Sequence, residues 1–180
     1  MSRIDNIGKQ GLEGRALEVF EIVERDYGAF GNMLGVLAHR PASIEHIYGL
    51  LLQSAKDALI TRRHLEIVLV TASRENQCQY CVSHHAPKLG ALGIDAHTVD
   101  NILDPDVPGL DPVERLVRDY ASAVTRQRVT DRLVERMREH FSQEQVVELT
   151  LRASLCAFFA RFNEALEIEV EEDVAGTPAH

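Results

Sequence analysis

The 180-residue sequence has no apolar run of eighteen residues, and this absence limits the classes of protein it can belong to. A helix needs about 20 consecutive, mostly apolar residues to span a bilayer, so no membrane segment is predicted. Residues 1–15 also lack the apolar region of an export signal. We therefore expect a cytoplasmic protein that has no membrane partner.

Positive charge is scarce too, with 19 lysine and arginine residues against 28 aspartate and glutamate residues and a formal net charge of −9. Proteins that bind nucleic acid neutralise phosphates with a basic face, so nucleic acid is excluded as an expected partner. A chain of this length with 45% hydrophobic residues can bury one core. We predict a single domain over residues 1–168 and a flexible acidic tail over 169–180.

No segment shows the period-two alternation of a half-buried strand, and apolar residues recur instead three and four positions apart. The pattern predicts an all-α fold, an irregular bundle of about eight helices. Residues 33–37 are interpreted as a short turn. Helices are expected over 12–27, 41–55, 62–74, 78 to 90 or 93, 96–103, 112–124, 133–141 and 143–166.

Several helix boundaries have a local signal. Thr61 is placed to cap the helix that follows it, and Asp111 with Glu114 has the spacing of a capping box. Pro87 lacks the amide that would bond to the Ser83 carbonyl, so we expect it to kink or shorten its helix.

Cysteine is rare as well, because the sequence has only three. Cys78 and Cys81 form a Cys-x-x-Cys pair, which in a reducing compartment indicates catalysis or metal binding rather than a structural disulfide. Cys156 lies on the apolar face of the last helix and is interpreted as a small buried filler.

An acid and a base accompany the paired thiols. A thiol attacks as its thiolate, and a free cysteine, with a pKa of about 8.5, is mostly protonated at neutral pH. A helix N-terminus lowers that pKa, and His85, one turn beyond Cys81, can accept the thiol proton. Glu66, expected within a buried helix, can orient His85 or relay its proton. The second thiol then closes a disulfide.

Neighbouring residues admit plainer interpretations. Glu66 can also be a structural acid paired with Arg62 or Arg63. His84 points about 100° away from the adjacent His85 and is expected to pack or lie at the surface. Tyr80, between the cysteines, is a secondary candidate that either donates a hydrogen bond into the site or packs beside the thiols.

Zinc is an alternative from another class, because Cys78, Cys81, His84 and His85 all carry potential ligand atoms. Structural zinc sites generally use two ligand pairs separated by a loop, which this chain does not offer. Covalent haem needs a histidine where Val82 stands, and a thioredoxin-like enzyme needs a βαβ pattern. We therefore predict no cofactor and no metal. A non-catalytic redox sensor remains a further alternative.

The spacing E-x11-C-x2-C-x3-H, formed by Glu66, Cys78, Cys81 and His85, resembles the signature of the alkylhydroperoxidase D and carboxymuconolactone decarboxylase family. The motif core covers residues 60–95. The resemblance implies an all-α, homo-oligomeric protein with antioxidant hydroperoxide reductase activity. It also implies that Cys81 is the peroxidatic thiol, Cys78 the resolving thiol, and His85 with Glu66 the proton relay.

One position departs from that family, since Tyr80 stands where the founding peroxidases have a histidine before the second cysteine. Decarboxylase members lack the two cysteines, so lyase activity is a secondary expectation. The sequence therefore predicts a thiol-dependent peroxidase that reduces a small hydroperoxide and is recycled by a dithiol, thioredoxin-like or lipoyl reductant. The alternatives are a zinc-binding or redox-sensing helical module, or a carboxymuconolactone decarboxylase-type lyase.

Overall fold

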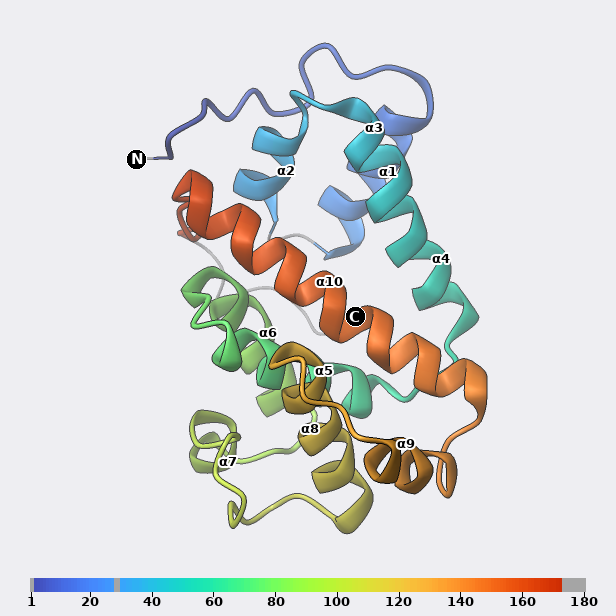
Figure 1. The fold of residues 1–180 in the computed structure, drawn as a ribbon. Helices are drawn as coiled ribbons and strands as arrows, with labels where there is room; N and C mark the ends of the chain where they lie inside the picture. Colours follow the sequence, from blue (N-terminus) through green and yellow to red (C-terminus); the bar gives the residue numbers. More distant parts are fainter. Residues whose placement is uncertain (1, 28–29, 173–180) are drawn as a thin grey trace. The chain divides into compact units, whose positions relative to one another are not determined.

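The computed structural model describes residues 2–27 and 30–172 (Figure 1). Every regular element in these two stretches is helical, so the all-α prediction is confirmed. Of the tail predicted over 169–180, residues 173–180 lie outside the described residues. The contacts divide the chain into one unit up to Ala58 together with the residues from Asn163 on, and a second unit over Leu59–Phe162. The single domain over 1–168 stays a prediction.

The first unit is built on α1 (Gly14–Tyr27), which buries Val19, Phe20 and Val23 at helical spacing. The expected turn at 33–37 is wrong, because α2 spans Gly31–Leu37. Its residues 33–37 are all buried, so no polar face marks the helix in the sequence. The helix expected over 41–55 is formed in three successive pieces, which are α3 (Pro41–Ser43), a π-helical turn (Ile44–Tyr48) and α4 (Gly49–Asp57).

The second unit contains the Cys-x-x-Cys motif. Its helix α5 packs against both α6 and α8 (Figure 1), and buried aliphatic side chains from these helices form the core. The helices of this unit are α5 (Arg62–Glu75), α6 (Gln79–Ala91), α7 (Ala96–Asp100), α8 (Pro112–Thr125), α9 (Asp131–Arg138) and α10 (Gln143–Leu166), which continues past Phe162.

Two predicted caps are confirmed. The Thr61 hydroxyl accepts a hydrogen bond from the His64 amide at 3.1 Å, and Asp111 with Glu114 forms a complete capping box at the start of α8. Pro87 does not shorten α6, which continues to Ala91. Because Pro87 is exposed, water can bond to the carbonyl that its missing amide leaves unpaired.

Within residues 2–27 and 30–172, no helix combines the length and apolar character needed to cross a bilayer.

Candidate active site

A tight connection between α5 and α6 determines where the thiols lie. The Gln77 backbone has a φ of 55°, in the left-handed region. Its amide bonds to the Arg74 carbonyl, and the Cys78 amide bonds to the Ser73 carbonyl at 3.0 Å. These two bonds are those of a Schellman motif, which ends α5. Cys78 then serves as the N-cap of α6, so the chain turns directly from one helix into the next.

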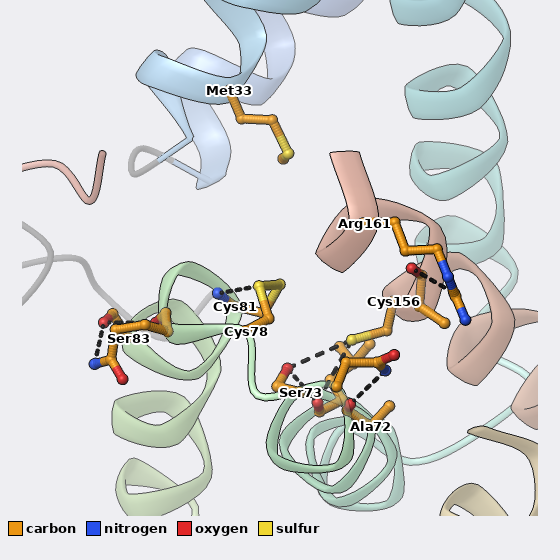
Figure 2. Close-up of a disulfide and its surroundings, with 12 residues drawn as sticks. Met33, Ala72, Ser73, Cys78, Cys81, Ser83, Cys156 and Arg161 are labelled. Carbon is orange, nitrogen blue, oxygen red and sulfur yellow. Dashed lines mark hydrogen bonds between the residues drawn. A yellow bond between two sulfur atoms is a disulfide. The ribbon is translucent and has the colours of Figure 1, made fainter. Parts of the chain in front are cut away.

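Cys78 and Cys81 form a disulfide at the start of α6, with Cα atoms 5.3 Å apart (Figure 2). Both residues are buried. The Cys78 sulfur accepts a hydrogen bond from the Cys81 amide at 3.2 Å. Unpaired amides and the helix dipole favour negative charge at this end of a helix, so a thiolate formed here on reduction is stabilised.

The predicted acid, Glu66, and the predicted base, His85, are in contact. Glu66 is only 1% exposed, and its Oε2 atom lies 2.9 Å from Nδ1 of His85. An ionised carboxylate can only accept hydrogen bonds, so Nδ1 carries the proton and donates it to Glu66. Neutral His85 therefore has its lone pair on Nε2, the nitrogen that can act as a base.

Glu66 also has a second partner on its own helix, because the Arg62 Nε lies 3.2 Å from Oε1. The functional and structural interpretations of Glu66 therefore both describe real contacts. Arg63, the other arginine considered from sequence, pairs instead with Glu114 on α8.

Electrostatics keeps Glu66 ionised despite its burial. Burial by itself raises the pKa of Glu66, but His85, Arg62 and Lys88 together hold it below its usual value. Burial lowers the pKa of His85, Glu66 opposes that change, and Lys88 adds to it. At neutral pH the site therefore holds a carboxylate next to a neutral imidazole, which is the state in which His85 can take up a proton.

Lys88 was not singled out by the sequence reasoning. It is 7% exposed and lies three residues after His85, on the same face of α6. The available signal was its spacing, since Cys81, His85 and Lys88 follow one another at intervals of four and three. An apolar residue is expected at such a position, and a lysine there is unusual.

Tyr80 and His84 pack against each other, with ring centroids 4.4 Å apart. Both are buried, at 4% and 2% exposure, so His84 is a packing residue rather than a surface one. No structural observation tests a role for Tyr80 in the relay. Within residues 2–27 and 30–172, no group of three or more His, Cys, Asp or Glu side chains is placed to hold a metal ion.

Cys156 is a buried free thiol on α10. Its sulfur forms a hydrogen bond with the Ser73 hydroxyl (Figure 2), and the two atoms are 3.4 Å apart. Burial raises the pKa of this thiol to about 11, so it is protonated at neutral pH. Such a thiol is a weak nucleophile, which agrees with its interpretation as a buried filler.

The Glu66–His85 pair predicts how stability depends on pH. His85 has a folded-state pKa below 6.5, so the unfolded chain binds the proton first and stability falls as the pH drops below that value. Glu66, whose folded pKa is also depressed, adds a loss below about 4.5. We expect the free energy of unfolding in urea to be lower at about pH 5 than at pH 7. The difference should shrink in His85→Gln and persist in His140→Gln, which changes an exposed histidine. An unchanged pH dependence in His85→Gln would contradict the assigned direction.

No protein-family model matches the sequence. Among curated proteins, the uncharacterized protein YdfG of Bacillus subtilis (strain 168) is 28% identical in an alignment of 102 residues, and the match covers 53% of this chain and 68% of YdfG.

Solved structures match nearly the whole chain. A peroxidase-related protein with an alkylhydroperoxidase AhpD core, from Ralstonia eutropha JMP134, matches with a TM-score of 0.75 and 20% identity, over 99% of this chain and 97% of that one. A peroxidase-related protein from Silicibacter sp. TM1040 has a TM-score of 0.72 and 17% identity, and the match covers 98% of each chain. A cysteine-to-alanine variant of the debrominase Bmp8, in complex with 2,3,4-tribromopyrrole, has a TM-score of 0.75 and 16% identity, over 97% of this chain and 96% of Bmp8.

These matches show that the chain has the alkylhydroperoxidase D-like fold. The resemblance predicted from the Cys-x-x-Cys motif is confirmed at the level of the fold. Because the fold is shared with a debrominase, it is one that supports enzymatic activity.

Proposed function

We propose that this protein is a thiol-dependent peroxidase that reduces hydroperoxides through Cys78 and Cys81. The observation that supports this proposal is the partly buried Glu66–His85 hydrogen bond, whose histidine lies one helical turn from a Cys-x-x-Cys disulfide at a helix N-terminus. The proposed base, the acid that orients it and the two-electron thiol couple all come from one helix pair, α5 and α6.

In the proposed reaction, Nε2 of His85 takes the proton of Cys81. The thiolate attacks the outer oxygen of the hydroperoxide, the O–O bond breaks, and the alcohol leaves with the proton from His85. Cys81 becomes a sulfenic acid. The Cys78 thiol attacks its sulfur, water leaves, and the disulfide forms. One hydroperoxide and two thiols give one alcohol, one water and one disulfide.

The cycle is completed by a reductant. A small dithiol, or a thioredoxin-like or lipoyl partner, reduces the Cys78–Cys81 disulfide by thiol–disulfide exchange. This step belongs in a reducing compartment, which supports a cytoplasmic location. We also propose a homo-oligomer. Support comes from α10, which exposes Val147 (65%) and Phe158 (42%), since exposed apolar side chains favour association with a second copy.

The test is a single turnover. Reduced protein is mixed with one equivalent of an alkyl hydroperoxide, and the alcohol and the disulfide are measured together. We expect one alcohol for each disulfide formed, and continued turnover when an excess dithiol is present. Protein whose thiols have been alkylated is the control. Hydroperoxide loss no faster than in that control would overturn the proposal.

Reductive dehalogenation is the second candidate. It is favoured by the match to the debrominase Bmp8 over 97% of this chain. The same dithiol can supply two electrons, so that an aryl bromide and two thiols give the aryl–H product, bromide, a proton and the disulfide. Reduced protein mixed with 2,3,4-tribromopyrrole would release one bromide for each disulfide. Bromide release without hydroperoxide consumption would favour this candidate over the peroxidase.

A further inference from the structure

The site contains a buried cation for which the proposed reaction has no role. Within α6, Cys81, His85 and Lys88 lie within an arc of about 60°, because successive residues are 100° apart. Lys88 is 7% exposed. A lysine buried to this extent normally has its charge paired. Lys88 lies on the same face of α6 as Cys81 and His85, so its charge can act on both groups.

Glu66 on α5 is the group of opposite charge. It interacts with Lys88, with Arg62 through Oε1 and with His85 through Oε2. Burial lowers the pKa of Lys88 from its usual value, and Glu66 opposes that change. One carboxylate therefore lies among two cationic side chains and one imidazole. From α10, Cys156 adds a protonated thiol whose pKa responds to Glu66, and His84 on α6 adds a second imidazole. With His85 neutral, the charges of Arg62, Lys88 and Glu66 sum to one positive charge.

We propose that Lys88 is a positioning residue that keeps His85 neutral and ready to accept a proton at Nε2. This inference rests on the proposed function and deepens it, since it assigns a role in the same proton relay. Lys88 acts through Glu66 and His85.

The physical reason is a balance of charges around His85. A bare Glu66 carboxylate would hold His85 as an imidazolium, and a protonated ring has no lone pair on Nε2. The Lys88 ammonium offsets that attraction and repels a proton on the ring, while Arg62 pairs with the other oxygen of Glu66. Burial lowers the pKa of His85 most, Glu66 opposes that change, and Lys88 adds to the lowering.

The experiment measures the protonation of His85 directly. Imidazole NMR signals are followed against pH in the disulfide form, where neither Cys78 nor Cys81 titrates, and the His85 signal is assigned by its loss in His85→Gln. Lys88→Met and Lys88→Gln both remove the charge, so a folding defect in one variant leaves the other. Lys88→Arg retains the charge, and Lys56→Met removes an exposed lysine as a matched control.

We expect the His85 midpoint to rise by about one pH unit in Lys88→Met and Lys88→Gln, and to stay near the wild-type value in Lys88→Arg and Lys56→Met. In the reduced protein, the pH dependence of Cys81 alkylation should shift upward together with the His85 midpoint in the two neutral variants, because the thiol and the imidazole titrate as a coupled pair. An unchanged midpoint in a folded neutral variant would overturn the proposal, as would an equal rise in Lys88→Arg. Neither readout uses a hydroperoxide, so failure of the proposed peroxidase activity would be seen separately.

Discussion

Replacing Cys81 by serine is expected to lower the rate of hydroperoxide consumption by about a thousandfold or more, because a hydroxyl at this position is not ionised at neutral pH. The site offers no substitute thiol in the same position. Cys78 is the N-cap of α6 and lies before its first turn, and Cys156 is protonated and buried on α10. The loss should appear in a single turnover, before any reductant is needed.

Cys78→Ser should behave differently, and the contrast assigns the two thiols. Its first step is intact, so one equivalent of hydroperoxide is consumed, and mass spectrometry should find Cys81 heavier by one oxygen. Turnover with a dithiol then slows, because no second thiol closes the disulfide. Cys156→Ser is the matched control and should keep the wild-type rate.

The opposite result in the two serine variants would exchange the attacking and resolving roles of Cys81 and Cys78. The Cys78 sulfur accepts the Cys81 amide in this structure, which favours negative charge on Cys78. If Cys81→Ser retained the single-turnover step while Cys78→Ser lost it, Cys78 would be the attacking thiol and the assignment taken from the family resemblance would be wrong.

Helical periodicity was sufficient to predict part of the site. Cys81 and His85 lie four residues apart on one helix, so their proximity follows from local geometry. The contact between Glu66 and His85 spans nineteen residues and two helices. It depends on the turn at Gln77, where the helical pattern breaks but no glycine, the usual signal, marks the left-handed residue. The motif resemblance predicted this contact, and periodicity alone did not.

The limit of helical periodicity, which describes one helix at a time, also explains what was missed in the fold and in the site. Residues 33–37 were interpreted as a turn because a helix buried on all sides has no amphipathic pattern. Lys88 was missed because its spacing shows which helix face it shares but not that it is buried beside an opposite charge, since Glu66 lies on another helix. Local rules predict which residues share a helix face, and tertiary packing decides which faces meet.

Glu66→Gln is the variant expected to separate the relay from the thiols. The amide has the size of the carboxylate, so the packing around it is kept while the negative charge is lost. Without that charge Glu66 no longer stabilises the imidazolium that forms when His85 takes the thiol proton. We expect the rate constant for disulfide formation to fall by about a hundredfold, which is a normal contribution of general acid–base catalysis. The His85 midpoint should fall as well, since the attraction of Glu66 is removed.

Glu148→Gln is the control, because Glu148 is also a buried glutamate, at 8% exposure, and pairs with Arg152 at 2.6 Å. Each variant leaves an arginine without its carboxylate, so each should lower the free energy of unfolding by about 1–3 kcal/mol. Only Glu66→Gln should slow disulfide formation, measured by stopped-flow mixing of the reduced protein with hydroperoxide at a temperature where both variants are folded. Equal slowing in the two variants would mean that the loss comes from general destabilisation. Slowing confined to Glu66→Gln would mean that the carboxylate acts through His85 on the proton of the attacking thiol.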